Sequence, residues 1–416
     1  MPQQLTIWTI CGIAAAGVIL RPFNLAEAVW AVAGAAVLLA LGLISIPDAL
    51  TGIGKGGDVY LFLFGMMLLG EIAREEGLFD WLAAVATSHA GGSPRRLFFL
   101  IYCVGTVVTI FLSNDATAVV LTPAVAAAVK AAEAKAPLPY LLICAFIANA
   151  ASFVLPISNP ANLVIYGSRM PPLLQWLQAY LLPSAVAIVA TYLFLRFTQR
   201  GALRQDLAKA LPRQLTAAGK MAAAGIAATA VALLVASALD IRLGLPTAIA
   251  GSLTALAVLI RERKWPWSMV KDISWGVLPL VAGLFVLVEA LGKTGLIDTI
   301  AALLRQGTEH AALATAALSG TAIALASNLI NNLPAGLIAA SAVQTAQAGE
   351  HVTRAILIGV DVGPNLSVTG SLATILWLAA LRREGLAVGF GAFLKIGVVV
   401  MPPALILAIA CALLMP

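Results

Sequence analysis

Two carboxylates stand in parts of the sequence that are otherwise apolar. Asp115 lies in FLSNDATAVVLTPAV (residues 111–125), directly after Asn114, and Asp361 lies in IGVDVGPNLSVTG (residues 358–370). A carboxylate that is removed from water holds a proton more readily, so it can load and release a proton near neutral pH. It can also coordinate a cation. We therefore take Asp115 and Asp361 as candidates for carrying a proton or holding a cation.

Both acids also have structural interpretations. Asp115 precedes an apolar run and can serve as the N-cap of the helix that follows, a position that favours aspartate. Asp361 can pair with backbone groups near Gly363 and Pro364. The asparagines beside these acids can join helices by hydrogen bonds within a membrane. An N-cap is compatible with proton carrying, so both interpretations stay open for Asp115.

The elements that must position these residues are membrane-spanning helices. The chain has 416 residues, of which 61% are hydrophobic and 11% are charged, and a soluble domain of this length cannot bury so much apolar surface. We expect an all-α, multi-pass protein of the cell's inner (plasma) membrane with roughly ten to twelve transmembrane segments. The apolar stretches cover residues 5–20, 26–46, 59–72, 97–112, 173–195, 221–239, 247–260, 277–291, 311–326 and 389–414.

Other classes of protein are excluded by composition and spacing. A β-barrel would alternate apolar and polar residues over segments of about 10 residues, and this chain does not. The net charge of +6 comes from basic residues between the apolar stretches, so it does not indicate nucleic-acid binding. The first apolar stretch lacks a basic n-region and is interpreted as a span. The four cysteines and three histidines are scattered, so we expect no metal, no cofactor and no enzyme activity.

A pattern of charged and glycine residues occurs twice in the sequence. The segments GMMLLGEIAREEGLFD and GLFVLVEALGKTGLID share the pattern G-x5-E-x5-G-L-x-D. Glu71 and Asp80 thus return as Glu289 and Asp298, 218 positions later. Both glutamates fall towards the ends of their apolar stretches, where contact with interfacial water explains them. The constant offset indicates that the chain consists of two related halves.

Each half also contains two interruptions of the apolar pattern. SNDATAVVLTP has an altered counterpart in SNLINNLP, which places Asn331 and Asn332 at an offset of 217. Residues 147–167 align with residues 359–379 at an offset of 212, and both stretches are rich in Pro, Gly, Ser, Asn or Thr. Irregular backbone at membrane depth is stable only where protein or a water-filled cavity satisfies it. We therefore expect broken helices and re-entrant hairpins that enclose a polar site.

Loop charge indicates that the two halves face opposite sides of the membrane. In the first half, the loop of residues 45–57 has Lys55 as its only basic residue, so this loop should face outward. We expect a first repeat in residues 1–199, a basic cytoplasmic linker in 200–217 and a second, inverted repeat in 218–416. Inverted repeats with interrupted helices are typical of secondary transporters, whose substrate site lies at the repeat interface. The central loop is predicted to be cytoplasmic because, against Asp206, it carries Arg196, Arg200, Arg204, Lys209, Arg213 and Lys220.

The polar side chains at the breaks are the candidate substrate-binding residues. They are Asn114, Thr117, Ser158, Asn159, Asn162, Asn331, Asn332, Thr369, Ser371 and Thr374. The motifs contain no Lys or Arg, and the nearest basic residues are Lys130, Arg169 and Arg354. Such a site suits a neutral hydroxylated solute or a cation. It suits a bare dianion less well, although helix N-termini and a co-bound cation can compensate.

The same motifs resemble a known family. LSNDATAVVLTPAV, SNLINNLPAGLIAA and IGVDVGPNLSVTGSLATILWLAAL are similar to stretches of the ArsB-type arsenite permeases of the ion transporter superfamily, and the resemblance runs over nearly the whole chain. It implies export of arsenite or antimonite in exchange for protons, assisted in some members by a soluble ATPase subunit. Many members have an acid where this chain has Asn149, so coupling here should depend on Asp115 and Asp361. Arsenite is mainly the uncharged trihydroxide at neutral pH, which suits a site without Lys or Arg.

Two other functions remain as alternatives. A Na⁺-coupled dicarboxylate carrier or a Na⁺/H⁺ antiporter of the same superfamily also has S-N-[DT] motifs at its helix breaks. The NNLP sequence, in place of a second S-N-T, favours the arsenite interpretation. A membrane-embedded enzyme would need a nucleophile–base set or clustered metal ligands, and neither is visible.

Overall fold

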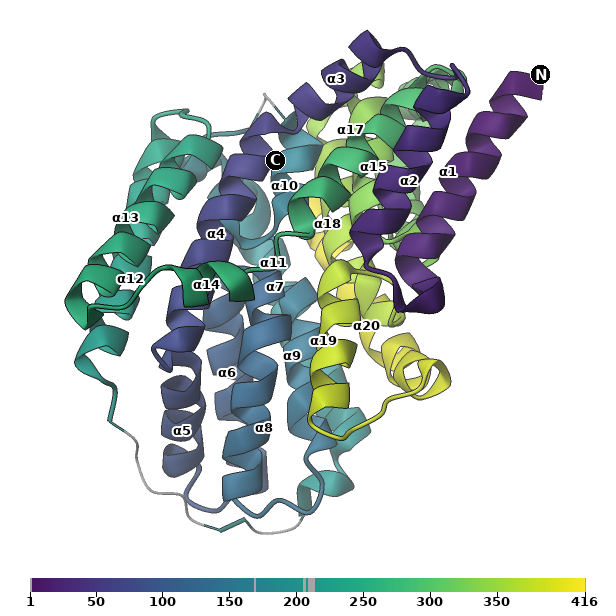
Figure 1. Ribbon diagram of the computed structural model, residues 1–416. Coiled ribbons are helices and arrows are strands. Elements are labelled where there is room, and N and C mark those ends of the chain that lie inside the picture. The colour runs from purple at the N-terminus through teal and green to yellow at the C-terminus, as the bar shows by residue number, and fades with distance from the viewer. Residues whose placement is uncertain (1, 168–169, 205–206, 209–213, 416) are drawn as a thin grey trace.

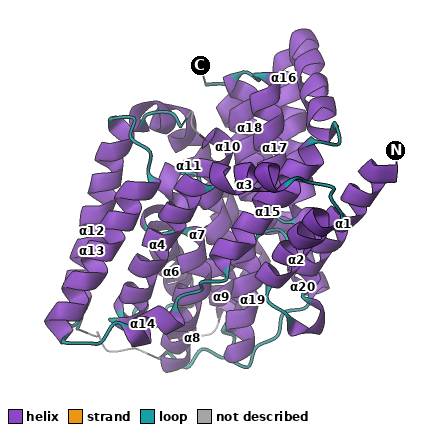
Figure 2. Ribbon diagram, turned by 45° about the horizontal axis from the view of Figure 1, so that its top comes forward, coloured by secondary structure: helices purple, strands orange, loops and turns teal. Residues whose placement is uncertain are grey.

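The computed structural model describes residues 2–167, 170–204, 207–208 and 214–415. These residues form helices and loops without strands (Figure 2). The helices up to the central linker are α1 (Pro2–Leu20), α2 (Glu27–Ala40), α3 (Ile46–Lys55), α4 (Gly57–Glu75), α5 (Leu78–Ala90), α6 (Pro94–Phe111), α7 (Asn114–Ala116), α8 (Thr122–Ala131), α9 (Leu138–Ala150), α10 (Pro160–Tyr166) and α11 (Leu173–Gln199). Those after the linker are α12 (Ala217–Ala238), α13 (Gly244–Glu262), α14 (Trp267–Asp272), α15 (Val277–Gly292), α16 (Leu296–Ile330), α17 (Asn332–Ala346), α18 (Glu350–Val362), α19 (Leu372–Arg383) and α20 (Phe390–Leu413).

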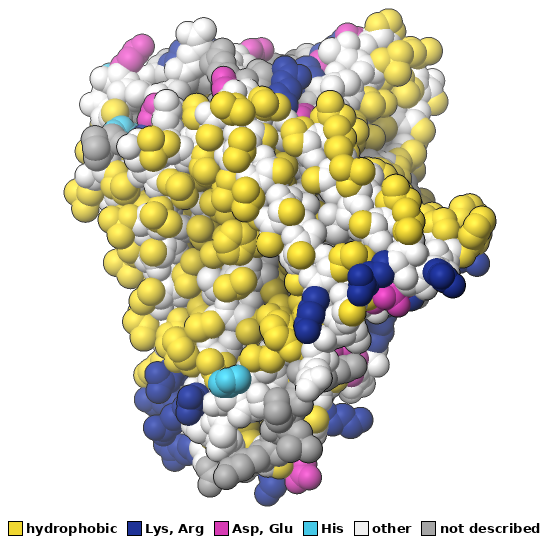
Figure 3. Space-filling model, turned by 90° about the vertical axis from the view of Figure 1, so that its left-hand side faces the viewer, with side chains coloured by type: hydrophobic (Ala, Val, Ile, Leu, Met, Phe, Trp, Pro, Cys, Tyr) yellow, Lys and Arg dark blue, Asp and Glu magenta, His cyan; other side chains and the backbone are white. Residues whose placement is uncertain are grey.

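The length and composition of these helices confirm a multi-pass membrane protein. Within the described residues, eight helices are long and apolar enough to span a bilayer, and the α3–α4 pair, bent by 49°, adds a ninth. The apolar helices α2 and α9 are shorter. The stretch expected at residues 26–46 contains α2, whereas α9 lies outside the expected apolar stretches. A broad band of hydrophobic side chains covers the face shown in Figure 3, and Lys and Arg gather along its lower edge. In a bacterium this architecture belongs to the inner membrane.

The helices break where polar residues interrupt the apolar pattern. α6 ends at Phe111, and α7 begins at Asn114 with Ser113 as its N-cap. α16 ends at Ile330, and Asn331 has φ 72° and ψ 150°, a positive-φ conformation that residues other than glycine rarely adopt. Loops 151–159 and 363–371 separate α9 from α10 and α18 from α19, with short 3₁₀ turns inside them. All four breaks were predicted from the sequence.

Close packing of helices α4 and α13 depends on small residues. Helices α4 and α13 lie side by side (Figure 1), and Gly65 meets the backbone of Thr247, where a Cβ on Gly65 would lie 2.2 Å from the carbonyl oxygen. On the facing helix, a Cβ on Gly251 would lie 2.5 Å from the Gly65 carbonyl oxygen. Such pairs of small residues let backbones approach closely in membranes, where van der Waals packing drives association.

A Gly65→Val variant should therefore be destabilised. The added side chain meets backbone that cannot move aside, and overpacking of this kind costs about 1–3 kcal/mol. Thermal unfolding in detergent, followed by size-exclusion chromatography, measures the effect. Gly70→Val is the matched control because Gly70 lies on the same helix and a Cβ there would meet nothing within 4 Å. Equal unfolding temperatures for the two variants would contradict this packing.

The central linker contacts the first half of the chain. Leu203 is buried, the backbone N–H of Leu207 donates to the Gly92 carbonyl (2.9 Å), and that of Ala208 donates to the Ala132 carbonyl (2.9 Å). These contacts hold the linker against the loops that follow α5 and α8. The predicted linker, 200–217, overlaps α12, which begins at Ala217, and its residues Asp206, Lys209 and Arg213 lie outside the described part of the chain, as does Arg169.

Candidate functional site

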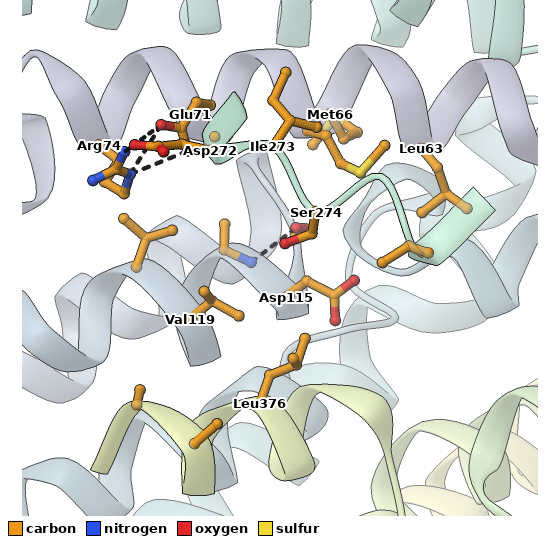
Figure 4. Close-up of a pocket in the computed structure, with 18 of the residues that line it drawn as sticks. Leu63, Met66, Glu71, Arg74, Asp115, Val119, Asp272, Ile273, Ser274 and Leu376 are labelled. Carbon is orange, nitrogen blue, oxygen red and sulfur yellow. Dashed lines mark hydrogen bonds and ion pairs between the residues drawn. The ribbon is translucent and has the colours of Figure 1, made fainter. Parts of the chain in front are cut away.

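A cavity of about 650 Å³ lies beside the first helix break. Its walls come from α4, α7 and the turn after it, the segment that follows α14, and α19. Figure 4 shows the carboxylate of Asp115 pointing into this space, with Leu63, Met66 and Leu376 around it. Asp115 is partly exposed and its carboxylate has no hydrogen-bond partner among the described residues. The carboxylate of Asp115 therefore lies unpaired in the cavity, beside mainly apolar side chains.

The break itself positions Asp115. The Ser113 hydroxyl accepts a hydrogen bond from the Ala116 N–H (3.1 Å), and the Asn114 side-chain oxygen accepts one from the Asp115 N–H (2.9 Å). Ser113 is thus the N-cap, the role considered for Asp115, whose carboxylate is left free. A π-helical turn, Thr117–Leu121, follows, and such turns are frequent at functional sites. Thr117 packs away from the cavity, where its hydroxyl shares a 2.8 Å hydrogen bond with Thr109.

Asp361 occupies a separate, fully buried position near the end of α18. The Asn159 amide donates to its Oδ1 atom (2.5 Å), and Oδ2 has no partner among the described residues. Asn159 also caps α10, because its side-chain oxygen accepts from the Ala161 N–H (3.0 Å). Pro160, the next residue, lines the cavity. The start of α10 therefore lies between the buried acid Asp361 and the cavity that holds Asp115.

A network of amides and hydroxyls joins the two re-entrant loops. The Asn149 amide donates to Asn365 Oδ1 (3.0 Å) and to Thr374 Oγ1 (3.3 Å). The Asn365 amide in turn donates to the Phe146 carbonyl (3.0 Å). Ser371 caps α19 and shares a hydrogen bond with Thr374 (2.9 Å). Asn149 lies at the end of α9, directly before the first re-entrant loop. Its partners Asn365 and Thr374 lie in the second re-entrant loop and at the start of α19, so the network holds the two loops together.

The second helix break rests on the tip of the second re-entrant loop. The Asn332 N–H donates to the Gly370 carbonyl (2.8 Å), and the Asn331 amide donates to the Thr369 carbonyl (3.4 Å). In the first half, the Ser158 hydroxyl donates to the Ile110 carbonyl (2.9 Å), near the end of α6. Each broken helix thus contacts one re-entrant loop.

Asn162 has a different role from the other candidate amides. Its amide nitrogen donates to the carbonyls of Ser152 (2.9 Å), Leu155 (3.3 Å) and Pro156 (3.4 Å), so it closes the first re-entrant loop on itself. Its side-chain oxygen is buried and has no partner among the described residues. Of the candidates, Asp115 lines the cavity, whereas Asp361 and the amides beside it lie behind its wall.

The charged rim of the cavity was not predicted from the sequence. Its residues are Glu71, Arg74, Lys271, Asp272, Arg383 and Glu384. Arg74 pairs with Glu71 and, at 2.6 Å, with Asp272, as Figure 4 shows. Glu71 was expected in interfacial water but is 8% exposed. The Glu71-x-x-Arg74 spacing, which places both on one helix face, is the signal that indicates this pair.

Comparison with known proteins gives a family and several relatives. The family described as CitMHS, citrate transporter, matches residues 13–360. The arsenical pump membrane protein of Escherichia coli (strain K12) is 25% identical over 414 residues, covering 92% of this chain and 94% of the relative. A putative arsenical pump membrane protein of Bacillus subtilis (strain 168) is 25% identical over 427 residues, covering 94% and 95%. An uncharacterized transporter of Mycobacterium tuberculosis is 26% identical over 397 residues, covering 91% of this chain and 91% of the relative.

Two solved structures share the fold at low sequence identity. The YdaH transporter of Alcanivorax borkumensis superimposes with a TM-score of 0.59 at 13% identity, covering 99% of this chain and 97% of that one. MtrF of Neisseria gonorrhoeae gives a TM-score of 0.55 at 15% identity, covering 90% and 85%. The family model matches most of the chain, and the helices of the chain are long and apolar enough to span a membrane. This chain therefore belongs to the CitMHS transporter family and is a membrane transporter of the ion transporter superfamily, not an enzyme.

Proposed function

We propose that the protein exports arsenite and antimonite as neutral trihydroxides in exchange for protons. The observation that carries this proposal is the similarity to arsenical pump membrane proteins over more than nine-tenths of the chain. The NNLP motif at the second break and the polar residues at all four breaks support it.

The cavity has the electrostatic character that a neutral solute needs. Its lining contains four carboxylates and three basic side chains, so it carries no excess of positive charge that would select an anion. The basic residues Arg74, Lys271 and Arg383 lie on the rim, and Arg74 is already paired. A solute with three hydroxyl groups can donate to Asp115 and to backbone carbonyls at the break. Substrate contact is therefore assigned to Asp115 and the residues beside it.

Proton exchange is assigned to two separate acids. Asp115 faces the cavity and Asp361 is buried behind the start of α10, so each can change its protonation without sharing a site. Desolvation opposes a buried charge unless it is paired, and Asn159 supplies one amide hydrogen bond rather than a cation. A proton at Asp361 would relieve that cost. Its exchange during each cycle is how we expect proton movement to be coupled to substrate.

Matching helix breaks also support the two-repeat organisation. We propose residues 1–199 and 218–416 as inverted repeats, because the breaks before α7 and α10 correspond to those before α17 and α19. In this arrangement each half contributes one of the two acids.

Transport by everted membrane vesicles tests the proposed function. Vesicles that contain the protein should accumulate arsenite when a pH gradient, acid inside, is imposed, and antimonite should compete. The assay contains no ATP, so a soluble ATPase subunit is not needed for the expected result. Accumulation that requires Na⁺ and is inhibited by succinate or citrate would refute arsenite–proton exchange.

A carboxylate carrier is the second candidate function. The family is described as a citrate transporter, and the cavity rim carries Lys271 and Arg383, which form no ion pair among the described residues. These two side chains can hold a carboxylate group of a substrate. Labelled citrate and succinate, offered with and without Na⁺ or Mg²⁺ in the same vesicles, distinguish this function from arsenite export.

A further inference from the structure

The mouth of the cavity has two rims with complementary charges. One rim is the end of α14, with Lys271 and Asp272, and the other is the end of α19, with Arg383 and Glu384. All four side chains are exposed, and all four line the cavity. A cation and an anion on each rim allow two pairs of opposite charge to form across the mouth.

The charges on the two rims are not paired with each other in this structure. Asp272 pairs with Arg74 of α4 (2.6 Å), whereas Lys271, Arg383 and Glu384 form no ion pair in the part of the chain that the structure describes. α14 is a short helix that crosses α4 (Figure 1), and the Arg74–Asp272 pair holds its end beside α4. The mouth between the rims is open, and three charges have no ionic partner.

We propose that these two rims form a gate that closes the cavity during transport, with Lys271 pairing with Glu384 across the mouth. In the closed state Arg383 competes with Arg74 for Asp272. The rim residues thus control access to Asp115. This gate rests on the transport function of the chain, and it does not require that arsenite be the substrate.

The expected strength of these pairs suits a gate that must reopen in every cycle. Exposed ion pairs change an equilibrium by roughly fivefold at most, and salt screens them. Two such pairs bias the cavity towards closure without trapping it. Reversal of one charge turns attraction into repulsion, so its effect should exceed the loss of a pair.

Chemical cross-linking tests the closed state without any substrate. In the full-length protein carrying Lys271→Cys and Glu384→Cys, a short bifunctional thiol reagent should join the two positions within one chain. The pair Lys271→Cys with Arg382→Cys is the matched control, because Arg382 is exposed at the same helix end but does not line the cavity. Failure of the Lys271–Glu384 pair to cross-link above this control would overturn the gate.

A charge swap tests whether the two rims interact. Lys271→Glu and Glu384→Lys should each lower the arsenite transport rate about fivefold to tenfold, and the double variant should return to within about twofold of the parent protein. High salt should reduce the effect of each single variant. Arg382→Glu should leave the rate unchanged. If the double variant shows the product of the two single defects, the gate is wrong. If the parent protein does not transport arsenite, cross-linking still decides the gate, so the two proposals can fail separately.

Discussion

An Asp361→Asn variant should lose proton-coupled transport while remaining folded in the membrane. Asparagine keeps the oxygen that accepts from the Asn159 amide, but it cannot bind and release a proton. We expect the transport rate under a pH gradient to fall by about 100-fold or more, the lower end of what a positioned proton-transfer group contributes. Uptake into everted vesicles at matched protein levels measures the loss.

The stability of the same variant separates a coupling role from a structural one. A buried carboxylate with one unpartnered oxygen is costly when charged, so its replacement by a neutral amide should leave the unfolding temperature unchanged or raise it. Asp298→Asn, which changes an exposed acid in the first turn of α16, is the control for charge removal and should transport normally. Normal proton-coupled transport by Asp361→Asn would remove this residue from the mechanism.

An Asp115→Asn variant should bind substrate more weakly. Its carboxylate points into the cavity without a hydrogen-bond partner among the described residues, so a hydroxyl of the substrate can donate to it (Figure 4). A hydrogen bond to a charged group contributes about 1.5–3 kcal/mol, so loss of the charge should raise the arsenite concentration for half-maximal transport by about 10- to 100-fold. Because Asp115 is also assigned proton exchange, the maximal rate should fall as well. The residual initial uptake rates over a range of arsenite concentrations measure the shift in the half-maximal concentration.

The control for Asp115→Asn is a substitution of Ser113, the N-cap of α7. Ser113→Ala removes the hydroxyl that accepts from the Ala116 N–H, which should cost about 1 kcal/mol of stability but leave the carboxylate in place. Its half-maximal concentration should therefore change less than that of Asp115→Asn. Equal shifts in the two variants would mean that the shape of the break, rather than the acid, controls binding.

The helix breaks were predictable because their causes are local. Asn331 and Pro334 interrupt an apolar run within four residues of each other, and residues 113–115 do the same in the first half. Lipid cannot satisfy freed backbone groups, so such interruptions in membrane helices require a polar environment. The same rule indicates the loops at 151–159 and 363–371, which both contain proline, serine and asparagine.

The partners of the predicted residues were not predictable, because they come from distant parts of the chain. Asn159 and Asp361 are 202 positions apart, and nothing near either residue indicates that they meet. The helix breaks in the sequence predict one polar pocket that both acids share. The cavity is instead lined by Asp115, whereas Asp361 lies behind its wall.

The rim of the cavity was missed for a related reason. Arg74 and Asp272 are 198 positions apart, and α14, which brings them together, is a six-residue helix between two long spans. The positive-inside rule assigns the basic residues of α14 to an ordinary cytoplasmic loop and does not indicate a contact with α4. Glu71, near the end of α4, is buried and pairs with the same arginine.

Simultaneous measurement of proton and arsenite movement in proteoliposomes tests arsenite–proton exchange most directly. With purified protein and a pH-sensitive dye inside the vesicles, addition of arsenite outside without Na⁺ should move protons out as arsenite enters, and the Asp361→Asn protein should show neither flux. Arsenite movement without proton movement, or transport of carboxylates but not arsenite, would contradict the exchange mechanism.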